Sequence, residues 1–220
     1  MKNKPLPLRL LRSVTGLTTF SFGIYLTLCA SIGLAPWDVL VTGLCNHIPL
    51  IYGNVALIIC AVILAIDLMM GEKLGLGTVI DALIVGKIVD LFNWLDWIGV
   101  SDTLWLSIVL LLLGIVCMSI GQWLHIGTAL GCGPRDALLM GLGKRFPKLK
   151  IGTVNAGLLL CVFTVGWLLG GQVGIGTVIS VVLTGPIMNL VFGLVKFEPR
   201  LVEHETILET LGKIKTKKSV

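Results

Sequence analysis

Two aspartates in apolar surroundings are the first residues of this sequence that could do chemistry. They occur in the matched tripeptides Pro36-Trp37-Asp38 and Pro134-Arg135-Asp136. Proline suits a first helical position, and a carboxylate in the first turn faces free backbone N–H groups, so each aspartate could simply stabilise the start of a helix. The same residues could instead bind a solute or ion, with Trp37 as an aromatic wall and Arg135 paired with an aspartate or attracting an anion.

A second set of ionisable residues, Asp81, Lys87 and Asp90, lies within one apolar segment. An ionised group at the centre of a bilayer costs about 3 kcal/mol or more, so such residues usually face the interior of a helix bundle. Lys87 and Asp90 can meet on one helical face, whereas Asp81 lies on the opposite face and needs a partner elsewhere. The set suits an ion path, or else Lys87 and Asp90 form a structural pair with the lysine extending outward.

The segments that carry these residues belong to an internal sequence repeat. Residues 33–44, GLAPWDVLVTGL, recur from residue 131 as GCGPRDALLMGL, an offset of 98. GLGTVI at residue 75 recurs at residue 174 as GIGTVI, an offset of 99. We therefore predict one structural unit present twice, with a tail at each end.

The buried charges belong to one copy only. The counterparts of Asp81, Lys87 and Asp90 are Ser180, Pro186 and Asn189. This difference suits an asymmetric ion or proton path better than a symmetric scaffold, and it adds Asn189 to the candidate binding residues.

Composition places this chain in a membrane. Of its 220 residues, 55% are hydrophobic and only 13% are charged, against about 25% charged in an ordinary soluble domain. The net charge of +5 comes from Lys and Arg in the tails and one loop. Membrane proteins place basic residues there, so binding to nucleic acid is not expected. We predict an all-α polytopic membrane protein.

Each copy is predicted to contain three membrane spans and one shorter apolar segment. Repeat 1 (13–95) has spans at about 14–30, 52–70 and 75–95 and a short segment at 36–48. Repeat 2 (103–195) has spans at about 103–124, 151–170 and 174–195 and a short segment at 134–143. The short segments would rise only about 15 to 20 Å as helices, less than the roughly 30 Å hydrocarbon core. We interpret them as half-helices that enter the membrane and return, or as broken helices.

Basic residues favour an inverted second copy. With three crossings per copy and the N-terminus inside, the clusters at 2–12, 144–150 and 196–218 are all cytoplasmic, together with Lys73 and Arg135. Four crossings would leave the copies parallel and would move Lys73 and Arg135 outside. We therefore expect inverted copies with both termini in the cytoplasm. Paired broken helices in inverted copies are typical of a transporter's central site.

Both tails, 1–12 and 196–220, are basic. The C-terminal tail alternates charged and apolar residues and ends in KIKTKKSV. It could form an amphipathic helix along anionic lipid, or it could remain a solvated tail.

Two Gly-x-Gly-Thr turns precede predicted spans. They consist of Gly75, Gly77 and Thr78 and of Gly174, Gly176 and Thr177. Such turns could hold an anion at a helix N-terminus, or they could allow a tight turn with the threonine as cap.

Enzymatic chemistry has little support in the sequence. The six cysteines lie singly and the three histidines are scattered, so we predict no metal site, no cofactor and no catalytic residue. Two intramembrane aspartates invite comparison with carboxylates that share a proton. No HExxH or GxSxG motif accompanies them, and we expect no enzyme.

The doubled Gly-x-x-Pro-x-Asp segment, together with the Gly-x-Gly-Thr-x-Ile turn, resembles the YczE/YyaS/YitT family of bacterial integral membrane proteins. The likeness is to its YczE-like branch and covers about residues 11–195. The resemblance implies a multi-pass protein of the bacterial cytoplasmic (inner) membrane and supplies no activity or catalytic residue.

Two functions remain open at this stage. The first is a small-solute transporter or channel-like carrier with a midplane site between the repeats. The alternative is a non-transporting membrane scaffold or regulator that acts on protein partners through its basic tail. The sequence leaves substrate, coupling ion and oligomeric state open.

Overall fold

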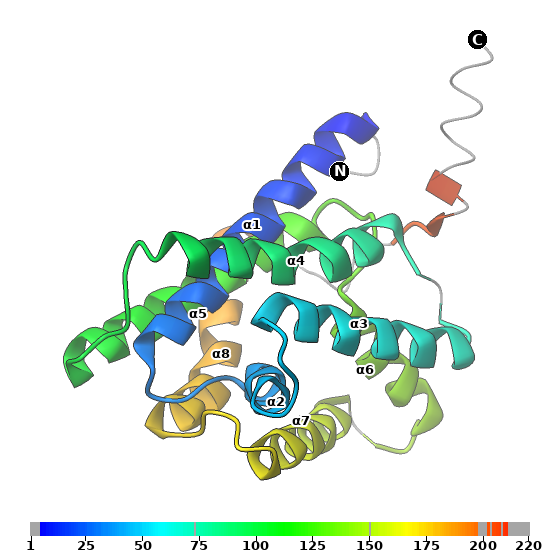
Figure 1. The fold of residues 1–220 in the computed structure, drawn as a ribbon. Coiled ribbons are helices and arrows are strands. Elements are labelled where there is room, and N and C mark those ends of the chain that lie inside the picture. Colours follow the sequence, from blue (N-terminus) through cyan, green and yellow to red (C-terminus); the bar gives the residue numbers. More distant parts are fainter. Residues whose placement is uncertain are drawn as a thin grey trace.

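The protein is all-helical over the residues that its computed structural model describes, which are 5–72, 74–149, 151–197, 202, 204–207 and 209–210. This confirms the all-α part of the predicted fold class. Eight helices make up this part of the chain (Figure 1). They are α1 (Leu6–Ala30), α2 (Pro36–Cys45), α3 (Tyr52–Met69), α4 (Leu76–Leu95), α5 (Leu104–Ile126), α6 (Pro134–Arg145), α7 (Ile151–Leu168) and α8 (Ile175–Leu194).

Helix lengths divide the elements into two kinds. Within the described residues, four helices are long and apolar enough to cross a membrane: α1, α3, α5 and α8. Helix α4 has 20 residues but carries three ionisable side chains. Helices α2 and α6, with 10 and 12 residues, would rise only about 15 to 18 Å, which is well short of a bilayer core.

Helix α1 begins at Leu6 rather than near residue 14 as expected, so part of the expected N-terminal tail is helical. Pro7 lies in its first turn, where a proline removes no intrahelical hydrogen bond. Arg9 in this early stretch is buried: its Nε donates to the Thr128 carbonyl oxygen at 2.8 Å, and its Nη1 lies 3.0 Å from the Glu205 carboxylate. The extension therefore packs onto the rest of the chain.

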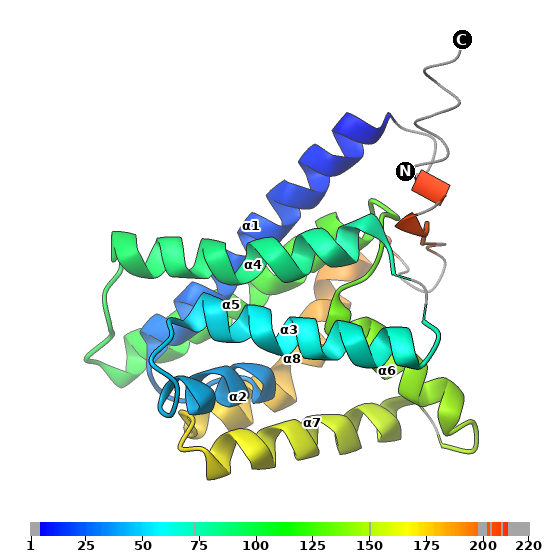
Figure 2. The same ribbon diagram turned by 45° about the vertical axis from the view of Figure 1, so that its right-hand side comes forward.

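Helices α3 and α4 run side by side, whereas α1 and α8 are inclined to them, and the α4–α5 connection lies at one end (Figures 1 and 2). Helices α1 and α5 cross antiparallel at two glycine pairs. A β-carbon on Gly16 would stand 2.7 Å from the Gly121 carbonyl oxygen, and one on Gly23 would stand 2.6 Å from that of Gly114. Only residues without a side chain allow this approach of two backbones.

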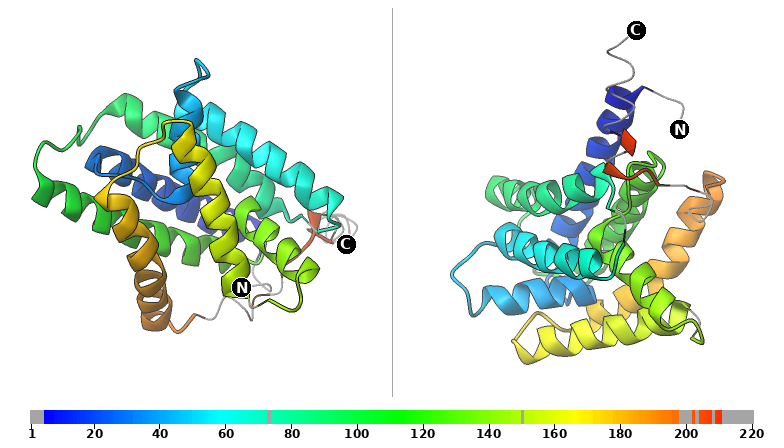
Figure 3. Two further views of the ribbon diagram at one scale, coloured as in Figure 1. Left: turned by 90° about the horizontal axis from the view of Figure 1, so that it is seen from below. Right: turned by 90° about the vertical axis from the view of Figure 1, so that its right-hand side faces the viewer.

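Each short helix packs against a long helix from the other half of the chain. Helix α2 lies on α7, with Gly43 against Gly166, and α6 lies on α3, with Gly141 against Met70. Helices α3 and α4 also pack closely together, whereas α8 packs on α5. Figure 3 (right) shows α8 on the opposite side of the molecule from α3 and α4.

Part of the C-terminal segment docks on the body of the protein. The Glu205 N–H donates to the Ala129 carbonyl at 2.9 Å, and the Ile207 N–H donates to the Leu74 carbonyl at 3.2 Å. The expected amphipathic helix of the tail, which ends in residues 211–220, lies largely outside the described residues, as do Lys73 and residues 1–4.

Candidate functional site

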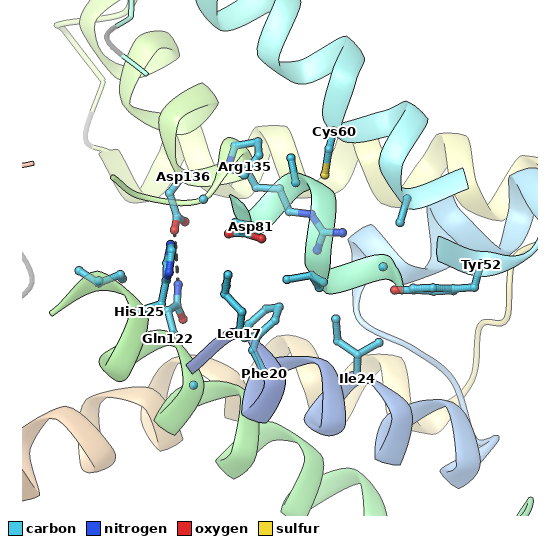
Figure 4. A pocket seen from close by; sticks show the side chains of 18 residues that line it. Leu17, Phe20, Ile24, Tyr52, Cys60, Asp81, Gln122, His125, Arg135 and Asp136 are labelled. Atoms are coloured by element: carbon cyan, nitrogen blue, oxygen red, sulfur yellow. Dashed lines mark hydrogen bonds between the residues drawn. The ribbon is translucent and has the colours of Figure 1, made fainter. Parts of the chain in front are cut away.

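A partly open cavity of about 100 Å³ lies between α1, α3, α4, α5 and the start of α6 (Figure 4). Its wall is mostly apolar. The polar side chains that line it come from four helices and are Tyr52, Asp81, Gln122, His125, Arg135 and Asp136. Apolar cavities with a few converging polar groups are the usual form of a small-ligand site.

The loop before α6 brings Asp81 and Asp136 together. The Leu130 carbonyl accepts a 2.8 Å hydrogen bond from the Gly77 N–H, which fixes this loop to the first turn of α4. At Gly133, directly before α6, a β-carbon would stand 2.6 Å from the Asp81 Oδ2 and 3.8 Å from the Asp136 Oδ2. The two carboxylates therefore flank one point at the wall of the cavity.

Arg135 joins α6 to α2. Its Nη1 lies 4.0 Å from the Asp38 Oδ1, and its guanidinium carbon stands 5.0 Å from the centroid of the Trp37 ring. Asp38 is 1% exposed and also accepts a 2.8 Å hydrogen bond from the Tyr52 hydroxyl. Of the uses considered for Arg135, the structure therefore has the pair with an aspartate, and it adds a cation–π contact to Trp37.

Asp136 faces α5. The Gln122 amide lies 3.5 Å from the Asp136 Oδ2, and His125 lies one turn further along the same helix (Figure 4). His125 Nδ1 is 2.9 Å from the Ser13 Oγ. Within the described part of the chain its Nε2 has no hydrogen-bond partner, although the residue is only 3% exposed.

Neither aspartate caps its own helix through its side chain. Over the described residues, the carboxylate of Asp38 bonds to Tyr52 and that of Asp136 to Gln122, and neither bonds to a backbone N–H of α2 or α6. A favourable interaction with the helix dipole remains available to both. Each carboxylate is thus held by tertiary contacts.

Lys87, Asp90 and Asn189 lie away from the cavity. Lys87 donates to the Asn54 side chain, and the Asp90 carboxylate accepts the Gly53 N–H at 2.7 Å. The considered Lys87–Asp90 pair does not form, because each residue bonds separately to α3. Asn189 is exposed on α8.

The Gly-x-Gly-Thr turns have the geometry of helix caps. Thr78 Oγ1 accepts the Gly75 N–H at 3.3 Å, and Thr177 Oγ1 accepts the Gly174 N–H at the same distance. The next glycine of each turn, Gly77 or Gly176, donates its N–H to a backbone carbonyl at 2.8 Å. The N–H groups of both glycines in each turn are therefore already used by the protein.

Sequence reasoning missed Tyr52, Gln122, His125 and Asp67. The first three line the cavity, and Asp67 on α3 is buried with no hydrogen bond to either carboxylate oxygen within the described residues. Gln122, His125 and Asp67 are polar residues inside apolar spans, so the sequence could have marked them as candidates. Whether their side chains face the cavity depends on the rotation of each helix, which the sequence does not give.

A second, wider pocket of about 450 Å³ opens beside the loops at 46–51 and 169–172. Tyr52 lines both this pocket and the cavity of about 100 Å³. The Tyr52–Asp38–Arg135 contacts therefore lie where the two spaces approach each other.

Comparisons with known proteins give relatives but no activity. A model of a "family of unknown function (DUF6198)" matches residues 7–192. The "uncharacterized membrane protein YczE" of Bacillus subtilis is 29% identical over 176 residues, which cover 79% of this chain and 80% of the relative. An "uncharacterized protein" of Haemophilus influenzae is 26% identical over 185 residues, 84% of each chain. The "uncharacterized protein YyaS" of B. subtilis is 29% identical over 193 residues, 82% of this chain and 90% of the relative. No solved structure matches the chain.

Proposed function

Because the chain belongs to the family of unknown function DUF6198, we argue its activity from its site and propose a small-solute transporter or channel-like carrier. The relatives YczE and YyaS confirm the predicted resemblance to the YczE/YyaS/YitT family. The observation that carries this proposal is the cavity with two carboxylates and an arginine among apolar helices. Ionisable residues inside a membrane bundle are costly and usually mark a solute or ion path.

The proposal includes two inverted copies of one unit, and the glycine contacts support it. Gly114 and Gly121 are the counterparts of Gly16 and Gly23 at the offset of 98. Gly16 packs on Gly121 and Gly23 packs on Gly114, so each glycine meets the counterpart of the other. Contacts exchanged in this way are what a two-fold axis between two copies produces.

A second exchanged pair lies at the half-helices. A β-carbon on Gly33 would stand 2.7 Å from Thr177 Oγ1, and one on Gly131 would stand 2.6 Å from Thr78 Oγ1. Each glycine before a short helix therefore packs on the turn of the opposite copy. Both glycines have positive φ values, +114° and +138°, which other residues rarely adopt.

In the proposed topology, α4 and α7 cross the inner membrane together with the four apolar helices, and α2 and α6 enter and return. Irregular backbone at membrane depth is tolerated where protein or a cavity surrounds it. Trp94, Trp97 and Trp105 are exposed around the α4–α5 connection, as expected for residues at a membrane–water interface. This connection would be external and both termini cytoplasmic.

The solute route in this proposal runs from the wide pocket past Tyr52 into the cavity. Tyr52 stands at the start of α3 and is held by Asp38, which in turn is held by Arg135 from the second copy. Rearrangement of one copy against the other would change these contacts and so open or close the route.

Reconstitution into liposomes tests the proposal. Liposomes that contain the purified protein should take up one or more solutes from a broad panel of small charged and polar compounds. Liposomes with the double variant Asp81→Asn/Asp136→Asn should lose this uptake, although the variant remains folded. Empty liposomes and the Asp90→Asn variant, altered outside the cavity, are the controls. Absence of both flux and ligand-induced stabilisation across the panel would overturn the transport proposal.

A further inference from the structure

We infer that the cavity binds a small organic cation of the ammonium or guanidinium type, held between Asp81 and Asp136. This inference rests on the proposed function and specifies its substrate class. Its starting point is charge: the cavity is lined by two carboxylates and one guanidinium. The guanidinium of Arg135 is already faced by Asp38 and by the Trp37 ring.

The two carboxylates have unused capacity to accept hydrogen bonds. Within the described residues Asp81 has no hydrogen bond or ion pair, and Asp136 has one long contact, the 3.5 Å approach of the Gln122 amide. An ionised carboxylate can accept several N–H groups, and bonds from a cation are about twice as strong as neutral ones. A cation between Asp81 and Asp136 would satisfy both.

His125 independently points to a ligand. Its ring is almost completely buried and lines the cavity, yet its Nε2 has no partner in the described part of the chain. The Ser13 contact fits either tautomer of the ring. In the tautomer with the proton on Nδ1, Nε2 is an acceptor, which is what the N–H groups of a cation require. Buried polar atoms without a partner are rare in native structures, and a bound ligand is one explanation.

Size and shape limit the cation. A cavity of about 100 Å³ holds only a few non-hydrogen atoms, because one water molecule occupies about 30 Å³ in the liquid. Phe20 and Tyr52 also line the cavity, and aromatic rings attract organic cations through their faces. A nucleotide would not fit.

Other ligand classes agree less well with these groups. An anion would lie beside two carboxylates in a site of low dielectric constant, where like charges repel strongly. For a metal ion, no group of three or more His, Cys, Asp or Glu side chains in the described residues has the required arrangement.

Guanidinium and urea provide a matched pair of probes, since they have the same planar shape and differ in charge. Guanidinium and methylammonium chlorides should raise the midpoint of thermal unfolding of the purified full-length protein and should be taken up by liposomes. Urea, sodium chloride and sodium acetate should do neither at the same low concentration. This comparison of cations with neutral and anionic compounds needs only the wild-type protein.

Three variants locate the cation. Asp81→Asn should weaken the response to guanidinium about tenfold or more, as expected when a charge-assisted hydrogen bond is lost. Gly133→Ala places a methyl group between the carboxylates and should weaken the response at least as much. Asp90→Asn, on the same helix as Asp81, should leave the response unchanged.

The failures of the two proposals can be told apart. If acetate or urea stabilises or enters and guanidinium and methylammonium do not, the cation inference is wrong and transport stands. An unaltered cation response in both Asp81→Asn and Gly133→Ala would also overturn it. If no solute of any class binds or enters, both proposals fall.

Discussion

The third and fourth helices of the two halves differ although their sequences correspond. In the first half, α3 and α4 pack so closely that a β-carbon on Gly86 would stand 2.8 Å from the Gly53 carbonyl oxygen. In the second half, the counterpart Gly185 on α8 has no atom within 4 Å of that position. Helix α8 therefore lies apart from its expected partner.

Polar groups follow the same division. Lys87 and Asp90 on α4 bond to Asn54 and to the Gly53 N–H, so they join α4 to α3. Their counterparts on α8 are Pro186 and the exposed Asn189. At the α3–α4 interface, called the α3–α4 seam below, the polar side chains of α4 have partners on α3. Helix α8 lacks this contact with α7, and uncharged residues occupy the corresponding positions. Helix α4 thus packs on both α1 and α3, whereas α8 packs on α5, the counterpart of α1, without a comparable interface with α7.

The largest expected difference between the halves is steric. Gly86→Leu should destabilise the protein by about 1 to 3 kcal/mol or more, because the side chain meets the α3 backbone. Gly185→Leu should change stability by about 0.5 kcal/mol or less, as at other open positions. Denaturant unfolding in one detergent measures both, and equal losses would contradict the difference between the seams.

A smaller effect is expected at the next pair of counterparts. Asp90→Leu leaves the Gly53 N–H without its acceptor and should cost about 1 to 3 kcal/mol. Asn189→Leu replaces an exposed residue and should be close to neutral. The same unfolding assay applies. A neutral Asp90→Leu would show that this hydrogen bond does not stabilise the α3–α4 seam.

The smallest expected effect is at Lys87. Its side chain is exposed and bonds to Asn54, so Lys87→Met should cost at most about 1 kcal/mol. Cation uptake should be unchanged, because Lys87 does not line the cavity. Loss of uptake in a folded Lys87→Met protein would show that Lys87 takes part in transport.

Tyr52 tests how the two halves are joined. Tyr52→Phe keeps the ring and removes the hydroxyl that donates to Asp38. If this contact closes the route between the wide pocket and the cavity, the rate of uptake should change while cation affinity stays near that of the wild type. A change in affinity alone, measured by thermal stabilisation, would place the hydroxyl at the ligand instead.

Local signals in the sequence predicted most of the helices. Helices α2 and α6 begin at Pro36 and Pro134 because proline fixes a first helical turn, and α3 begins at Tyr52 as expected. The start of α1 could not be predicted in the same way. The burial of Arg9 depends on Thr128 and Glu205, which are far away in the sequence.

The candidate site was predicted as separate pieces. The sequence indicated Asp81 and the Arg135–Asp136 pair as polar groups within the membrane, but their meeting at Gly133 depends on how the loop before α6 attaches to α4. Lys87 and Asp90 share a helical face, yet α3 offers each a better partner. Spacing along one helix identifies possible neighbours, and packing between helices decides which of them bond.

Sidedness of single cysteines tests the inverted arrangement of the two copies most directly. In a background without the six native cysteines, Asn46→Cys follows α2 and Arg145→Cys ends α6, and both positions are exposed. With a membrane-impermeant thiol reagent on intact cells, the account predicts labelling at position 46 from the outside and at position 145 only after the cytoplasmic face is opened. Labelling of both positions from the same face would contradict it.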